Sequence, residues 1–285
     1  MPDAQRQFVD LIFRASRKYA SWDPEVVVAV GDYGRITRGK TGLAFWRKKQ
    51  GIFLKEGNIY KDGLAEKYDI PGAEEHGVDS TEGISWITSK NAKEVDIAAE
   101  VSAQTPALVS CKVKGAFKFV SGRGAIIAMN NDIIYTIDSP GKLRRLLDEE
   151  KLKGLVIVSE VHRCSSYARF LATEGGATVA LGLSLEDPIG DSASLDAKWV
   201  RNASAGNFKA RVNATGKRDF YPLFRLVSLV EGDVSTGLRG ELDEDPPLPD
   251  ALPPWDAGEQ EREGTGELRR RGIFTALPAM LRRKN

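Results

Sequence analysis

The sequence predicts an α+β fold, a twisted and mainly antiparallel sheet with peripheral helices. Many short segments alternate apolar and polar residues, as strands with one buried face do. Only a few segments have helical periodicity, and they do not alternate regularly with strands. The chain has 285 residues, of which 41% are hydrophobic, so it can bury a substantial core. We expect residues 1–240 to form one globular domain.

The first predicted element is an amphipathic helix over residues 5–20. Its apolar face comprises Phe8, Leu11, Ile12, Ala15 and Tyr19. Its basic residues are Arg6, Arg14, Arg17 and Lys18. Such a helix lies on an anionic membrane surface, or it is an ordinary surface helix with solvated charges. The sequence leaves both interpretations open.

Two strands follow, over residues 25–36 and 51–59, and a connection carries adjacent aromatic and basic residues. Phe45 and Trp46 precede Arg47, Lys48 and Lys49. Aromatic rings backed by cations are suited to the headgroup boundary of a membrane. In the alternative interpretation, the two rings pack beneath a neighbouring helix.

The most regular alternation lies in residues 94–119. In residues 109–119 the odd positions are mainly apolar, and the even positions include Lys112, Lys114 and Lys118. In residues 94–103, apolar residues alternate with acidic ones. If the chain reverses at 104–107, Glu100 faces Lys112 and Glu94 faces Lys118. Opposite charges across two strands fix their register more than they add stability.

A second amphipathic pair is available in residues 177–185 and 208–215, which a loop-like segment (187–206) separates. The strands approach the roughly 9–11 residues that a tilted membrane-crossing strand needs. An ordinary half-buried antiparallel sheet has the same alternation, so both interpretations remain open. Residues 155–161 and 221–230 predict further core elements, and residues 139–147 a short basic helix.

The sequence contains few residues suited to catalysis. His76 and His162 are its two histidines, and Cys111 and Cys164 have neither metal-site nor redox spacing. No nucleophile motif or phosphate-binding loop is present, so we expect no catalytic residues, metal or cofactor. The basic residues are scattered among acids, which argues against nucleic-acid binding. The start of the chain has no apolar signal sequence, so we expect a cytosolic protein.

The composition changes beyond Gly240. Residues 241–263 are acidic and rich in proline, which predicts an exposed linker that proteases can reach. Residues 264–285 are basic and carry apolar side chains at helical spacing. Such a segment can dock back on the body through its tether. These apolar residues are Ile273, Phe274, Leu277, Met280 and Leu281.

Several motifs, in this order, resemble the pore-forming domain of gasdermins. They are GDYGRI, FWRKK, GIFLKEGNIY, CKVKGAFKFVSGRGAIIAMNN, PGKLRRLL and LKGLVIVSEVHRCSSYARFLA. The likeness covers about residues 5–232 and is greatest to the fungal gasdermin-like proteins of heterokaryon incompatibility. The linker and tail resemble members that proteolysis releases.

The resemblance implies an autoinhibited, non-enzymatic executor of lytic cell death in innate immunity. An activating protease would cut in the linker, near Leu248, Leu252 or Trp255 if it prefers large apolar residues. The basic helix and the aromatic tip would bind acidic lipids of the plasma membrane or another anionic membrane. Segments 84–120 and 167–215 would become hairpins of a homo-oligomeric β-barrel pore. Its lumen would be lined by Glu94, Glu100, Lys112, Lys114 and Lys118.

Two alternatives accompany this interpretation. The protein could be a non-lytic lipid-binding adaptor in immune signalling, which uses the same basic surface without insertion. It could also be a pore former that an incompatible allelic partner activates instead of a protease. Leakage of anionic liposomes separates a pore former from an adaptor.

Overall fold

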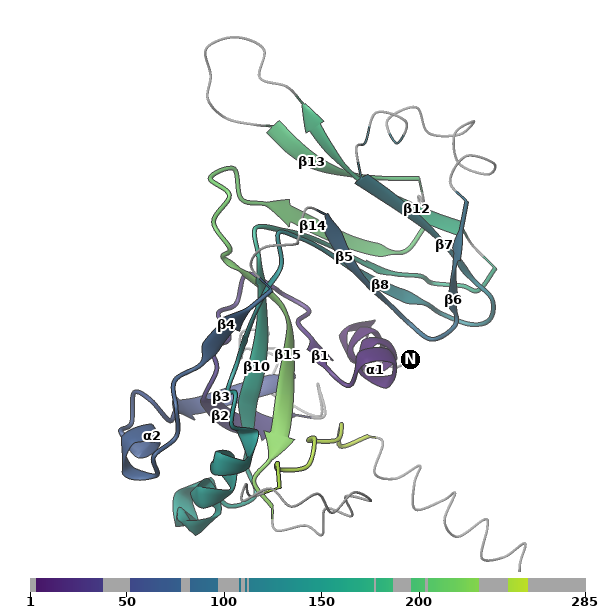
Figure 1. Ribbon diagram of the computed structural model, residues 1–285. Coiled ribbons are helices and arrows are strands. Elements are labelled where there is room, and N and C mark those ends of the chain that lie inside the picture. Colours follow the sequence, from purple (N-terminus) through teal and green to yellow (C-terminus); the bar gives the residue numbers. More distant parts are fainter. Residues whose placement is uncertain are drawn as a thin grey trace, which may run out of the picture.

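The computed structural model confirms a mainly antiparallel α+β fold with three sheets and few helices (Figure 1). It describes residues 4–37, 52–77, 83–96, 108, 111, 113–176, 178–186, 196–202, 205–230 and 246–255. Its helices are α1 (Ala4–Ser16), α2 (Leu64–Lys67), η1 (Pro140–Asp148) and η2 (Glu150–Leu152). Across the described residues, no helix combines the length and the apolar character that membrane crossing requires.

The largest sheet, which we call the base sheet, has seven strands. Its main path runs β1-β15-β10-β2-β3, and β9 pairs with both β10 and β4. The largest hydrophobic cluster of the described residues packs on this sheet. The strands are β1 (Tyr19–Ala20), β2 (Asp32–Ile36), β3 (Phe53–Asn58), β4 (Glu74–His76), β9 (Ile133–Thr136), β10 (Val156–Cys164) and β15 (Phe220–Ser228).

Two four-stranded sheets form the rest of the fold. The inner sheet has the order β14-β11-β8-β5, and the outer sheet has the order β13-β12-β7-β6. The inner strands are β5 (Ile84–Thr88), β8 (Ala125–Asn130), β11 (Ser166–Leu171) and β14 (Asn207–Val212). The outer strands are β6 (Ala92–Val95), β7 (Val113–Phe119), β12 (Thr178–Glu186) and β13 (Asp196–Arg201).

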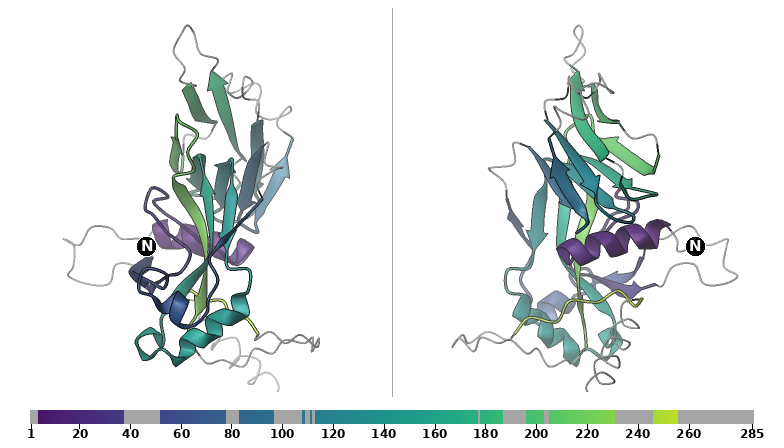
Figure 2. Two further views of the ribbon diagram at one scale, coloured as in Figure 1. Left: turned by 60° about the vertical axis from the view of Figure 1, so that its left-hand side comes forward. Right: turned by 90° about the vertical axis from the view of Figure 1, so that its right-hand side faces the viewer.

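Helix α1 lies at the junction between the base sheet and the inner sheet (Figure 2). Its Phe8 and Ile12 belong to one cluster with Ile127 and Tyr167 of the inner sheet and Leu223 of β15. Phe8 and Ile12 of the predicted apolar face are buried and Leu11 is partly buried, and Val9 and Phe13, which the prediction left out, are buried as well. The amphipathic helix also ends earlier than predicted, at Ser16, because Arg17 has a left-handed backbone (φ 61°) and Tyr19 enters β1.

The strand predicted over residues 25–36 is shorter than expected, because β2 begins only at Asp32. The Asp32 carboxylate is buried and accepts hydrogen bonds from the backbone N–H of Ala29 (2.9 Å) and from Asn58 Nδ2 (2.7 Å). These bonds, together with the left-handed Gly31 (φ 81°), turn the chain before the strand. The apolar run in residues 26–30 is thus a loop, in which Val28 and Val30 are buried.

Candidate functional site

The same four stretches of chain build the inner and outer sheets in the same spatial order. β5 continues into β6, β7 into β8, β11 into β12 and β13 into β14. Residues 84–130 and 166–212 therefore form two long antiparallel hairpins, which we call the bent hairpins. Each is folded over at corners so that its two halves lie in different sheets (Figure 1).

The two central strands have the same register on both sides of the bend. Ser166 faces Asn130 in the inner sheet, and Thr178 faces Lys118 in the outer sheet. Each strand thus advances by twelve residues between these two pairs. At the corner, Ala172 N donates to Gly124 O at 2.8 Å. Gly176 N donates to Phe119 O at 2.8 Å, one residue out of this register, so straightening would change the pairing at the corner but not that of the strands on either side.

Odd-numbered side chains of the central strands are mainly apolar in both sheets, but the bend splits them between two cores, and even-numbered Ile126 and Phe170 of the inner sheet add to the second core. Odd-numbered residues of the inner sheet, such as Ile127 and Tyr167, pack against α1. In the outer sheet, the odd-numbered Phe117 and Val179 point into the core between the layers. The even parity there holds small or basic residues. They are Lys114, Ala116, Lys118, Thr178, Ala180, Gly182 and Ser184.

The predicted register of the first hairpin is wrong by one residue. Glu94 faces Phe117, and Lys93 faces Lys118. Between the pairs Ile84–Asn130 and Ala92–Phe119, one strand advances by eight residues and the other by eleven, so the corner holds three extra residues. A register slip of this kind moves side chains to the opposite face.

The structure describes three of the five residues that were predicted to line the pore lumen. Lys118 and Glu94 are exposed, and Lys114 is half-buried, with its Nζ donating to the carbonyl of Leu108 at 3.4 Å. Glu100 and Lys112 lie outside the described residues. Strand β7 begins at Val113, later than predicted, and Cys111 packs on the outward face beside Ala116.

The second hairpin also differs from the prediction. Residues 187–206 were expected to form a loop, but they contain β13, which pairs with β12, whereas β14 pairs with β11. Trp199 of β13 is buried, and its Nε1 donates to Ser166 Oγ across the two layers at 2.6 Å. A tryptophan in an otherwise polar stretch was the available signal for this strand.

The four cations predicted on the amphipathic helix do not form one free surface. Arg6 lies over the Trp255 ring at 5.0 Å, and Arg17 lies over Phe13 at 5.8 Å. Arg14 Nε is 3.2 Å from Asp10 Oδ1. Lys18 is largely buried and forms an ion pair with Glu160. The predicted lipid contact of Lys18 is therefore unavailable in this conformation.

Lys18 belongs to a buried ionic network that the sequence analysis missed. His162 Nδ1 lies 3.0 Å from Asp132 Oδ2, and its Nε2 lies 3.1 Å from Glu160 Oε1 and 2.7 Å from Lys18 Nζ. The network joins the link after α1 to β10 and to the turn before β9. The signal was present as two ionisable residues within the apolar strand VIVSEVHRC.

Burial and ion pairing have opposite effects on the pKa values of Glu160 and His162. Burial alone would raise the pKa of Glu160, but hydrogen bonds from His162 and Lys18 lower that pKa to about 2. Burial would lower the pKa of His162, but its two carboxylate partners raise that pKa above the ordinary value. The Glu160 carboxylate and the His162 imidazolium are therefore favoured together. Burial also raises the pKa of the Cys164 thiol, which favours its protonated, unreactive form.

The linker predicted to be exposed is docked over residues 246–255, which we call the docked segment. Asp250 bridges to Val227, and the backbone N–H of Ala251 donates to Leu226 O at 2.9 Å. The segment thereby covers the edge of β15 that the short β1 leaves open. Leu248 is buried with it, so proline-rich composition did not prevent packing.

The docked segment also reaches α1, because Trp255 Nε1 donates to Asp10 Oδ1 at 3.3 Å. Tyr19, at the end of the link from α1, donates to Ala251 O at 2.8 Å. Of the three cleavage candidates, Leu248 is inaccessible, Trp255 is half-buried and Leu252 is exposed. We therefore retain Leu252 as the accessible candidate.

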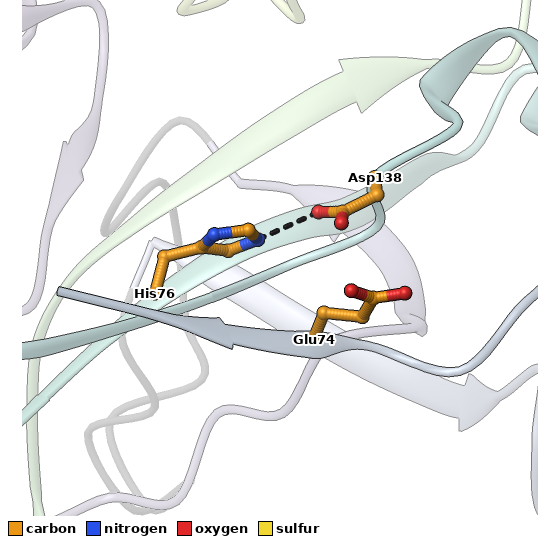
Figure 3. A group of neighbouring side chains, drawn as sticks. All are labelled: Glu74, His76 and Asp138. Atoms are coloured by element: carbon orange, nitrogen blue, oxygen red, sulfur yellow. Dashed lines mark hydrogen bonds and ion pairs between the residues drawn. The ribbon is translucent and has the colours of Figure 1, made fainter. Parts of the chain in front are cut away.

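One cluster among the described residues has donor atoms suited to a divalent cation. His76 and Glu74 of β4 and Asp138 after β9 offer ligand atoms within 4.8 Å of one another (Figure 3). His76 Nε2 lies 2.7 Å from Asp138 Oδ1, and it lowers the pKa of that carboxyl, whereas Asp138 raises the pKa of Glu74. All three residues are exposed.

The remaining predicted site residues lie outside the described residues. These are the aromatic and basic tip (Phe45, Trp46, Arg47, Lys48 and Lys49) and the apolar residues of the tail (Ile273, Phe274, Leu277, Met280 and Leu281). Their predicted roles in lipid binding and autoinhibition stay predictions.

Comparison with known proteins finds no family model and no curated protein that matches this chain.

Proposed function

We propose that this protein is an autoinhibited pore former and that its two bent hairpins straighten into a membrane after activation. The observation that carries the proposal is the register that the two central strands share on both sides of the bend. Straightening would keep these pairings and bring the divided apolar parity onto one face. The resemblance to gasdermins supports the same function.

Strand length explains why the bent form suits water and the straight form suits lipid. β7 has seven residues and β8 has six, and neither reaches the roughly 9–11 residues that cross a bilayer. Joined through the corner, they exceed that length. In lipid, backbone groups must be paired internally, and the shared register supplies those pairs.

The charged residues at odd-numbered, mainly apolar positions indicate which part of the hairpins would enter the membrane. In the central strands these residues are Arg123 and Arg169, and both lie on the inner-sheet side. With residues 113–121 and 175–183 in the bilayer, Arg123 would lie at the headgroup boundary, where long cationic side chains are favourable, and Arg169, level with Ile127, would lie further out in water. Lys114 and Lys118 would face the water-filled lumen.

Activation, in this proposal, begins with a protease cut in the C-terminal region. A cut at Leu252 would free Trp255 from Asp10, and undocking of the remaining residues 246–252 would then remove the bond between Tyr19 and Ala251. Release of α1 would uncover the odd-numbered residues of the inner sheet. Copies of the chain would then bind acidic lipids, assemble and lyse the cell.

Dye release from vesicles tests the proposal. Residues 1–240, residues 1–255 and the full chain are each added to vesicles with phosphatidylserine or cardiolipin, and phosphatidylcholine vesicles serve as the control. We expect release by 1–240 alone, because 1–255 keeps the docked segment. Equal release by both truncations would assign the inhibition to residues 256–285. Binding without release would replace the pore with the adaptor function.

A scan along β12 tests the straightened geometry. Single cysteines at Val179, Ala180, Leu181 and Gly182 are labelled with an environment-sensitive fluorophore in the 1–240 chain. After insertion, labels at 179 and 181 should be quenched by nitroxide lipids, and labels at 180 and 182 by aqueous iodide. A signal without this period of two would contradict membrane-spanning strands.

A further inference from the structure

A cavity of about 290 Å³ lies on the base sheet, away from the bent hairpins. The loop of residues 27–30 forms one wall, and side chains of β9, β10 and β15 form the other. The first wall is aliphatic, whereas the second includes the rings of Tyr135 and Tyr221. A concave apolar site with few polar groups is the usual form of a small-molecule site.

Arg163 supplies the cationic group of this cavity. Its guanidinium lies 5.3 Å from the Tyr135 ring centre and 5.5 Å from that of Tyr221. Its Nε donates to Arg218 O at 3.0 Å, and its two terminal nitrogens have no partner among the described residues. The carboxylate of Glu75 accepts instead from the Tyr135 hydroxyl at 2.5 Å. Arg163 is thus held in place with donors to spare.

The apolar surface continues beyond the cavity. Val26 and Val27 precede the buried part of the loop, and they are 57% and 60% exposed. Val27 also lines the cavity, so the exposed strip begins at its wall. A ligand that used the whole surface would be longer than the cavity and apolar along its length.

We infer that this cavity binds a single-chain anionic amphiphile. The alkyl chain would lie against Val27, Val28 and Val161, and the anionic head would accept hydrogen bonds from the free nitrogens of Arg163. A carboxylate and a phosphate monoester share this chemistry. The inference goes beyond the proposed pore function, because it concerns the base sheet of the resting chain.

Isothermal titration of the full chain with decanoate tests the inference, at concentrations below micelle formation. Decanoate should bind roughly tenfold more tightly than octanoate, because each buried methylene adds to the affinity. Comparing the affinity of decyl phosphate with that of decanoate identifies the preferred anionic headgroup. Decyltrimethylammonium should bind at least about tenfold more weakly than decanoate, because its charge opposes that of Arg163.

Two variants locate the site. Arg163→Gln should weaken decanoate binding about tenfold or more, and Gly72→Leu should block it by filling the cavity. A Cβ at Gly72 meets no atom within 4 Å, so that substitution is compatible with the fold. Gly83→Leu is the matched control, because Gly83 is equally open but does not line the cavity.

Three results would overturn the inference. These are absence of decanoate binding up to its solubility limit, unchanged binding by both variants, and equal binding of the cationic amphiphile. Unchanged thermal unfolding of Gly72→Leu without ligand would show that a loss of binding reflects the filled cavity. None of these measurements involves membranes, so failure here and failure of the pore proposal are distinguishable.

Discussion

The base sheet and the bent hairpins are both antiparallel, but they are held together differently. The base sheet packs around the largest hydrophobic cluster of the described residues and is crossed by a buried ionic network. The layers of the bent hairpins meet in smaller separate clusters, and their chain turns at glycine-containing corners. Small independent clusters can open locally at a lower free energy than one large core.

The contrast implies a division of roles. The base sheet provides a stable frame, and the bent hairpins form the part that can change conformation without unfolding the rest. Four predictions test this difference, from the largest expected effect to the smallest.

Lys18→Met should destabilise the base sheet most. It removes one partner of Glu160, and breaking a buried ion pair in this way costs roughly 3–5 kcal/mol. Urea unfolding measures the change in the free energy of unfolding. Lys67→Met is the control, because the Lys67–Glu149 pair is exposed and should contribute far less to stability. Equal losses of unfolding free energy in the two variants would mean that the buried network stabilises the fold no more than the exposed ion pair does.

The ionic network should also give the base sheet a pH dependence. The lowered pKa of Glu160 contributes stability above the unfolded value of 4.5, and this stability is lost as the pH falls towards about 2. Its size is on the order of 3 kcal/mol. The raised pKa of His162 contributes stability below 6.5 that is lost as the pH rises through the folded value.

Urea titrations across this pH range compare the parent with Glu160→Gln and His162→Gln. The first variant should lose the acidic dependence, and the second should lose the alkaline dependence. Parallel pH curves for all three proteins would argue against the network as their source.

Gly124→Ala should destabilise the bent form of the first hairpin by about 1–3 kcal/mol, because its Cβ would lie 1.9 Å from Phe119 Cδ1. The protection of β7 amides against hydrogen exchange should fall, whereas that of β10 amides should not. In the 1–240 chain, the same change should speed dye release. Gly72→Ala is the control in the base region, because Gly72 does not have a left-handed backbone and a Cβ there meets nothing within 4 Å. Loss of protection in β10 with Gly124→Ala would show that the two regions unfold together.

Lys93→Glu should have the smallest effect. In the observed register Lys93 faces Lys118, so the substitution replaces a repulsive pair with an attractive one worth about 0.2–1 kcal/mol. Hydrogen exchange of β6 and β7 measures the gain. Glu94→Lys is the comparison, because it would gain nothing in this register but would oppose Lys118 in the register predicted from sequence.

Alternation was enough to locate most strands but not to choose their partners. The apolar parity of β7 and β12 was correctly assigned from sequence, because a strand that buries one face must repeat with period two. The pairing of β12 with β13 was missed, because a strand of six residues with a single tryptophan carries little periodic signal. Register was missed by one residue at Glu94, because alternation does not fix the residue at which the chain reverses between the two strands.

For the candidate site too, the sequence predicted the regions involved but not their long-range contacts. Local patterns identified the basic helix and the amphipathic hairpins as the regions of interest. They did not predict that Lys18 would be buried beside His162, or that residues 246–255 would cover β15. Lys18 and His162, for example, are 144 positions apart in the chain.

The sequence by itself determined which residues form strands, which faces are apolar and where charge gathers, because these depend on neighbours two to four positions away. Only the tertiary structure decided the bend of the hairpins, their register, the ionic network and the docking of the C-terminal segment. These features depend on the free energy of contacts between distant segments, and several partners with similar alternation compete for each strand edge.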